Sequence, residues 1–199
     1  MITFYENKNL EVAAFQQAKE NMAYCGDGHL VITEEDYAVC AVVDGLGSGK
    51  GAYESADVVI KEVERNHHLS PNDIVNACNK RLLGKRGAVI TLMKIDFKHN
   101  VVYYSNYGNV SFVLYYPNGK IIQPIPKRGY LSGRQERIEL ERYPYEEGST
   151  FIVYTDGVKK PPAKERLVGL NKVKEEANAL FGGAIFEQDD VTLLIGKLH

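Results

Sequence analysis

The segment YAVCAVVDGLGSGKG, residues 37–51, places an apolar run directly before an aspartate and a group of glycines. The length and β-branched content of residues 37–43 predict a strand that is buried on both faces. From Ala52 to Arg65 the apolar residues recur at helical spacing, which predicts a helix. The segment therefore predicts a strand-to-helix turn with Asp44 at its start.

The rest of the chain contains two further helical patterns and several strand patterns. Ser70 suits an N-cap and Pro71 the first helical position, so a second helix is predicted over residues 70–82. Beyond it we expect strands over 88–97, 101–107, 110–116, 121–122 and 149–154, a helix over 168–181 and a strand over 191–196. This order lacks regular β-α-β alternation. It predicts an α+β fold of mainly antiparallel sheets with helices packed outside, in one domain covering residues 1–199.

Composition narrows the function classes. Hydrophobic residues make up 44% and charged residues 25%, as in ordinary globular proteins, and the net charge of -2 provides no basic field for nucleic acid. No apolar run is long enough to cross a bilayer, and the N-terminus lacks the pattern of a signal peptide. Three widely spaced cysteines without a CxxC pair indicate a reducing compartment. We therefore expect a cytoplasmic protein, and with no sensor or coiled-coil segment in view, a monomer. The irregular stretch 124–137 is expected to be a surface loop over the site.

Aspartates stand at the predicted ends of several strands, next to glycine or to one another. They occur in Gly26-Asp27-Gly28, Asp44-Gly45, Asp156-Gly157 and Asp189-Asp190. If these strand ends converge, the carboxylates repel one another and raise each other's pKa values. A divalent cation, or a pair of them, removes that penalty, and oxygen-only ligands favour Mg²⁺ or Mn²⁺ over zinc.

The glycines after Asp44 allow other interpretations. Residues 47–52 contain G-x-G-x-x-A, a form of the dinucleotide fingerprint, which would indicate a nucleotide-binding oxidoreductase. Against it, the Asp44 carboxylate would repel a pyrophosphate, and the β-α-β context is missing. A P-loop is excluded because Gly51 follows Lys50 where Ser or Thr is required. A purely structural turn and a non-catalytic binding module remain as alternatives.

Taken together, the four acidic motifs and the glycine run resemble the PPM/PP2C serine/threonine phosphatases, most closely their bacterial SpoIIE-type branch. The resemblance implies a PP2C-like β-sandwich of two mainly antiparallel sheets flanked by helices, with two Mn²⁺ or Mg²⁺ ions. It implies Asp44, Asp156 and Asp27 as the catalytic aspartates. It also implies a metal-ligand set of Asp44, the Gly45 carbonyl, Asp156, Asp189, Asp27 and Asp190, the last of which stands where many relatives carry Asn.

The resemblance further implies a substrate class and a reaction. The substrates would be phosphorylated stressosome proteins of the RsbS and RsbR type, and the effect would be negative regulation of the sigma-B general stress response. The two ions would activate water for attack on phosphorus. A non-catalytic PP2C-fold binding module in a signalling complex is the alternative that this resemblance leaves open.

The chain departs from the eukaryotic pattern of this family at two places. Leu46 occupies the position of a histidine that is a candidate general acid, so the leaving-group proton must come from metal-bound water or another residue. No arginine precedes Arg65, so the phosphate-binding arginine near the N-terminus is missing. We therefore expect the metals alone to hold the substrate phosphate, and turnover to be modest.

Overall fold

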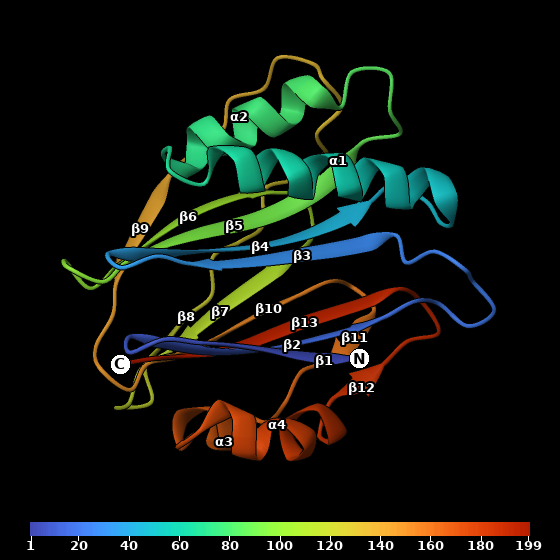
Figure 1. Cartoon of the computed structure of the whole chain (residues 1–199). Coiled ribbons are helices and arrows are strands. Elements are labelled where there is room, and N and C mark those ends of the chain that lie inside the picture. Colours follow the sequence, from blue (N-terminus) through green and yellow to red (C-terminus); the bar gives the residue numbers. More distant parts are fainter.

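A computed structural model, which describes residues 1–199, consists of two β-sheets packed face to face between two pairs of helices (Figure 1). The six-stranded sheet has the order β1-β2-β13-β10-β7-β8 and the five-stranded sheet the order β3-β4-β5-β6-β9, while β11 and β12 form a separate pair. All the strand pairs are antiparallel. The predicted α+β sandwich flanked by helices is the architecture observed.

The elements have the following bounds. The helices are α1 (Lys50–Asn66), α2 (Pro71–Arg81), α3 (Lys164–Val168) and α4 (Val173–Gly182). The strands are β1 (Ile2–Glu6), β2 (Leu10–Gln17), β3 (Asp27–Thr33), β4 (Tyr37–Gly45), β5 (Ala88–Asp96), β6 (Val101–Tyr107), β7 (Ser111–Tyr115), β8 (Ile121–Ile122), β9 (Glu141–Pro144), β10 (Thr150–Tyr154), β11 (Val158–Lys160), β12 (Ile185–Phe186) and β13 (Val191–Leu198).

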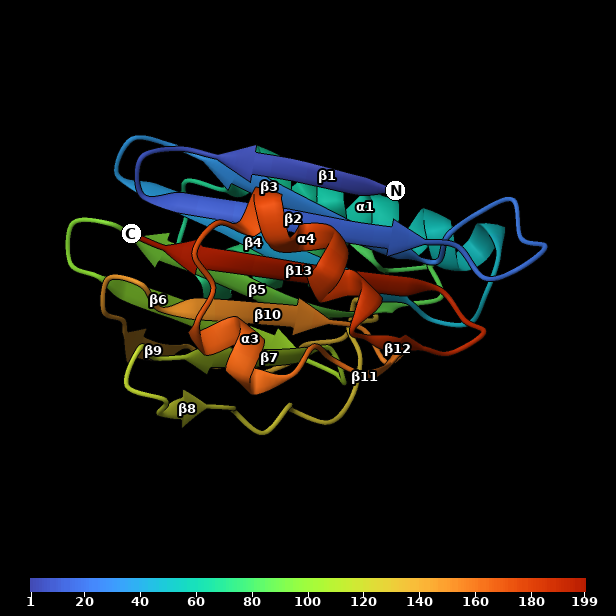
Figure 2. The ribbon, with the colours of Figure 1, turned by 90° about the horizontal axis from the view of Figure 1, so that it is seen from below.

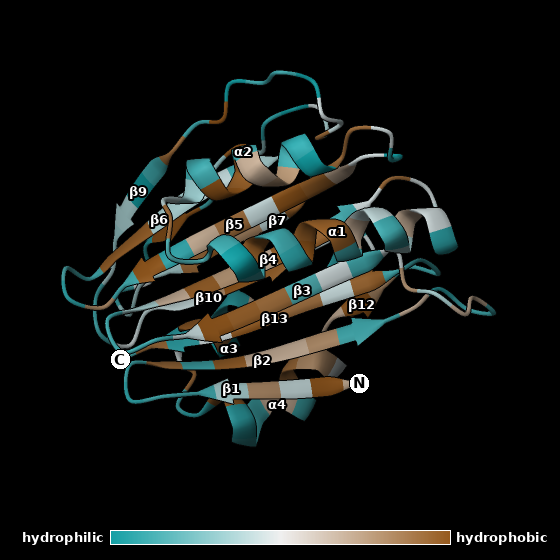
Figure 3. Ribbon diagram, turned by 45° about the horizontal axis from the view of Figure 1, so that its top comes forward, coloured by the Kyte–Doolittle hydropathy of each residue, from teal (hydrophilic) through white to brown (hydrophobic).

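Three layers of apolar side chains hold the sandwich together. The largest, with 21 buried residues, lies between the sheets and includes Phe112 and Phe151 from one sheet and Tyr104 from the other. A second layer joins α1 and α2 to the five-stranded sheet, and a third joins α3 and α4 to the six-stranded sheet. Figure 2 shows α3 and α4 lying across the six-stranded sheet. Strands covered on both faces need apolar residues at every position, which explains the unbroken apolar run of β4 (Figure 3).

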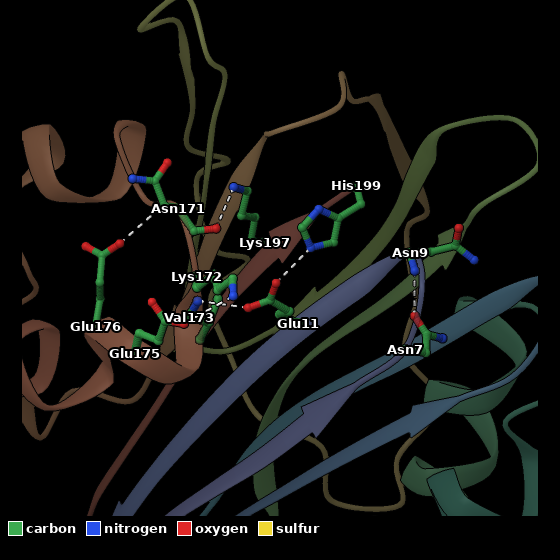
Figure 4. Close-up of polar contacts among 10 residues, drawn as sticks. All are labelled: Asn7, Asn9, Glu11, Asn171, Lys172, Val173, Glu175, Glu176, Lys197 and His199. Carbon is green, nitrogen blue, oxygen red and sulfur yellow. Dashed lines mark hydrogen bonds and ion pairs between the residues drawn. The ribbon is translucent and has the colours of Figure 1, made fainter.

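The predicted helix over 168–181 is wrong at its start. The structure has α3 and α4 there, separated by the segment from Gly169 to Lys172. The N-terminus of α4 is fixed from a distant strand, because the Glu11 carboxylate on β2 accepts a hydrogen bond of 2.9 Å from the backbone amide of Val173 (Figure 4). The other Glu11 oxygen lies 3.0 Å from His199 Nε2, so one side chain joins α4, β2 and the end of β13.

Lys94 on β5 likewise binds backbone groups next to a helix end, in this case just after the C-terminus of α1. Its ammonium donates hydrogen bonds to the carbonyls of His67, His68 and Leu69, at 3.0, 2.9 and 2.8 Å. It also lies 4.3 Å from the centroid of the Tyr37 ring. These carbonyls lie directly after Asn66, the last residue of α1, in the turn to α2. They have no partner within the helix, so the cation satisfies acceptors that the helix itself cannot satisfy.

We predict that Lys94→Met lowers the free energy of unfolding by about 1–2 kcal/mol, because the three carbonyls lose a charged donor while the aliphatic stem is kept. Urea unfolding measures the change. Lys98→Met, at an exposed position on the turn that follows β5, is the control and should change stability by less than about 0.5 kcal/mol. Equal effects of the two substitutions would show that the helix-end contact contributes nothing.

Candidate active site

The first two predicted aspartates face each other across a strand pair. Asp27 is the first residue of β3 and lies directly opposite Asp44, near the end of β4. Directly opposed residues in an antiparallel pair project on the same face of the sheet. Beyond this pair the Gly45 amide donates to the Gly26 carbonyl at 3.0 Å, which continues the ladder past the aspartates. Two carboxylates are thus fixed side by side on rigid strand ends.

The other three aspartates come from the opposite sheet. Asp156 follows the end of β10, and Asp189 and Asp190 directly precede β13, its antiparallel neighbour. The end of one strand therefore meets the start of the other. This edge lies at the same end of the sandwich as the start of β3 and the end of β4, on the right in Figure 1, where the loop between β2 and β3 projects.

The five aspartates line one pocket of about 240 Å³. Its remaining walls are Leu46, Gly47 and Asn109. Gly45 is not part of the lining, but it allows α1 to pack on the turn, since a Cβ there would lie 2.0 Å from the Ala52 carbonyl oxygen. No three of the carboxylates close into a compact group of metal ligands. The structure thus brings together all five acidic residues that the sequence singled out, as separated carboxyl groups around a cavity.

Crowding and burial change the titration of the two central carboxyls. Burial raises the pKa of Asp44 to about 8, and the neighbouring carboxylates add to the increase. Burial also raises the pKa of Asp27 to about 7, partly opposed by a hydrogen bond from Thr155. At neutral pH the pocket therefore favours bound protons or a bound cation over free anions. This donor set of carboxylate oxygens fits Mg²⁺ or Mn²⁺.

Two neutral side chains orient the aspartates. Thr155 Oγ1 donates to Asp27 Oδ2 at 2.7 Å and accepts from the Thr192 amide at 3.0 Å, which connects the two sheets at the pocket. Asn109 Nδ2 donates to Asp156 Oδ2 at 2.9 Å from the turn between β6 and β7. Sequence reasoning missed Asn109, since Gly108-Asn109 indicated only a break between strands. Its one signal was a polar side chain in a turn directly after a buried strand.

Asp190 differs from the other four aspartates. Its Oδ1 accepts the Lys19 amide at 2.8 Å and its Oδ2 accepts the Gly26 amide at 2.9 Å. Both oxygens therefore hold the backbone of the loop between β2 and β3. Asp189 instead lies 3.5 Å from the Lys19 ammonium, through a contact that is open to solvent. The sequence predicted Asp190 as part of the metal-ligand set and contained no sign of this backbone clamp.

An arginine missed by the sequence analysis lies next to the pocket. Arg86 Nη1 donates to the Ser48 carbonyl at 3.2 Å, and its guanidinium approaches Gly47 so closely that a Cβ on that glycine would be 3.0 Å away. Arg86 precedes β5 and reaches this place only because β5 pairs with β4. An arginine thus stands beside the pocket, although no arginine is present in the N-terminal part of the chain where the family resemblance predicts one.

Comparison with known proteins points to one family. The protein-family model described as Stage II sporulation protein E (SpoIIE) matches residues 34–199. The phosphoserine phosphatase RsbX of Bacillus subtilis (strain 168) is 35% identical over 198 residues, with both chains covered completely. The crystal structure of an RsbX in complex with magnesium matches all of both chains with a TM-score of 0.93 and 35% identity. A chain solved in work on the bacterial stressosome matches with a TM-score of 0.86 and 26% identity, covering 96% of this chain and 100% of that one.

The raised pKa values predict how the metal-free protein responds to pH. The folded state keeps protons on Asp44 and Asp27 that the unfolded chain releases near pH 4, so stability is lost as the pH rises from about 4 to about 8. Asp44→Asn should stabilise the metal-free protein at about pH 8 by about 1–3 kcal/mol and flatten the pH dependence. Urea unfolding with a chelator measures both. Asp57→Asn, on the outer surface of α1, is the control. If the free energy of unfolding depended on pH equally in the wild type and both variants, the raised pKa of Asp44 would be contradicted.

The clamp at Asp190 predicts a local change in dynamics. Asp190→Ala should speed hydrogen exchange of the Lys19 and Gly26 amides by about tenfold or more, because each loses a charged acceptor. Asp190→Asn keeps one acceptor oxygen and should release one of the two amides only. Hydrogen exchange followed by NMR resolves the two cases. Unchanged exchange at both amides in Asp190→Ala would show that the loop is held by other contacts.

Proposed function

The chain belongs to the SpoIIE family of PP2C-type serine/threonine phosphatases, and on that premise we propose that it is a metal-dependent phosphatase of phosphorylated stressosome proteins. The chain is thus a protein phosphatase, a hydrolase, rather than a non-catalytic binding module. The observation that carries the proposal is the pocket in which five aspartates from both sheets converge. The alternative of a nucleotide-binding oxidoreductase is not supported, because a pyrophosphate bound at the glycines of residues 47–52 would face these carboxylates.

We propose that two Mn²⁺ or Mg²⁺ ions bind in this pocket. Asp44, Asp27, Asp156 and Asp189 would be the carboxylate ligands. The family resemblance adds the carbonyl of Gly45, which stands in the chain between the lining residues Asp44 and Leu46, as a further oxygen. Asp190 would position the pocket through its backbone clamp. Support comes from the oxygen-only donor set, the raised pKa values of Asp44 and Asp27 and the magnesium complex of the RsbX structure. When bound, the ions would supply an activated water and neutralise charge on the phosphoryl group.

The surrounding residues would prepare the site for that chemistry. Thr155 and Asn109 hold the Asp27 and Asp156 carboxylates in fixed orientations, so less reorganisation is needed when substrate binds. Leu46 contributes an aliphatic wall and has no proton to donate. Arg86 provides a positive charge at the Gly47 side, where substrate phosphate would approach. This modifies the expectation that metals alone hold the phosphate.

The relatives support a proposal for the cellular role. We propose that the substrates are phosphorylated proteins of the RsbS and RsbR type and that dephosphorylation acts as negative regulation of sigma-B. The likeness to RsbX and to a chain solved in work on the bacterial stressosome supports this role. None of the helices has the length and apolar content needed to span a membrane. We further propose a cytoplasmic monomer in which residues 1–199 form one phosphatase domain.

We predict that the protein releases phosphate from a phosphoserine-containing RsbS-type protein in the presence of Mn²⁺, and that Asp44→Ala reduces kcat/KM by at least about 10²-fold. Asp57→Ala on α1 is the control and should retain activity. Calorimetry should show that Asp44→Ala also weakens Mn²⁺ binding. Equal phosphate release by the wild type and Asp44→Ala would refute the metal assignment.

A further inference from the structure

A second hollow, of about 310 Å³, lies beside the aspartate pocket and differs from it in charge. Its walls are Gly108, Asn109, Pro126, Lys127, Arg128 and Gly129. Asn109 also lines the aspartate pocket, so one side chain separates the two cavities. The second hollow contains two basic residues and no carboxylate. An anion that the aspartate pocket repels would be attracted by the basic residues of the second hollow, on the other side of Asn109.

The segment that carries the basic residues is firmly attached. The Lys127 amide donates to Asn106 Oδ1 at 2.8 Å, and the Lys127 carbonyl accepts from the Gly108 amide at 2.7 Å. Four residues further along, Leu131 and Ala88 exchange two backbone hydrogen bonds, of 2.8 and 3.0 Å. The hollow is therefore a preformed part of the fold, although the segment 124–137 has almost no regular secondary structure.

The two basic side chains differ in their availability. Lys127 Nζ donates to the Arg137 carbonyl and lies 5.2 Å from the centroid of the Tyr107 ring, so it is used within the protein. Arg128 is exposed and forms neither an ion pair nor a hydrogen bond. Its planar guanidinium keeps a full set of donors for a carboxylate or phosphate, which it can bind through two parallel hydrogen bonds.

We propose that this hollow is a subsite for an acidic side chain of the protein substrate, close in sequence to the phosphorylated residue, with Arg128 as the group that recognises it. The assignment rests on the proposed function, since it assumes that the phosphoryl group lies in the aspartate pocket. A phosphopeptide that places its phosphate there extends past Asn109, and a neighbouring carboxylate then reaches Arg128. The subsite would add specificity that the aspartate pocket cannot supply.

The test compares phosphoserine peptides that carry Glu, Ala or a second phosphoserine at the positions flanking the scissile residue. The wild type with Mn²⁺ should show about five- to tenfold higher kcat/KM for the Glu peptide than for the Ala peptide, mainly through KM. Arg128→Ala should reduce this ratio to about one, and Arg128→Lys should restore it only in part. Arg134→Ala, on the same segment but facing a different groove, is the control and should keep the full preference.

Each result decides between distinct conclusions. A preference for Glu that Arg128→Ala removes supports the subsite, and a stronger preference for the second phosphoserine would identify phosphate as the better anion. No preference in the wild type, or a preference that survives in Arg128→Ala, overturns it. Equal losses for all peptides in Arg128→Ala would place Arg128 on the reacting phosphate and also overturn it. Hydrolysis of 4-nitrophenyl phosphate by the wild type shows separately whether the proposed phosphatase function holds.

Discussion

Five carboxylates at one end of the sandwich repel one another, and the groups around them are arranged to offset this repulsion. Each aspartate stands at a strand end. The pairing of the strands within the two sheets therefore sets the positions of all five aspartates. The groups around them are donors: a threonine hydroxyl, an asparagine amide and two backbone amides. These hydrogen bonds offset part of the electrostatic cost and fix the directions in which the free oxygens point.

The apolar layer between the sheets makes this crowding tolerable. Phe112, Phe151 and Tyr104 lie in the layer that holds the sheets face to face, and the pocket opens at its end. A buried core of this size contributes far more to stability than the pocket removes, so the protein can keep buried, mutually repelling carboxyl groups at this site. Asp27 and Asp44 come from one sheet and the other three aspartates from its partner. The distance between the sheets therefore sets the size of the cavity.

Local patterns in the sequence predicted the buried strands, α1, α2 and the acidic strand ends, because each depends on residues close together in the chain. Convergence of the aspartates depends on strand register. A single sequence does not reveal that register, so only the family resemblance predicted that the aspartates share one site. Asn109, Arg86 and the Asp190 clamp were missed because each acts on a residue far away in sequence. The helix over 168–181 was wrong at its start for the same reason, since the group that caps α4 is Glu11, 162 positions away. The hairpin of β1 and β2 also escaped the sequence analysis.

The position of β13 in the six-stranded sheet has a consequence for biosynthesis. This strand, Val191–Leu198, lies between β2 and β10, although β2 leaves the ribosome first. The β1–β2 hairpin must therefore wait, with one edge unpaired, until almost the whole chain has been translated. The five-stranded sheet needs no residue beyond β9 and can form earlier. Because Asp189 and Asp190 directly precede β13, the strand that joins β2 to β10 also brings the last two of the five carboxylates into the pocket.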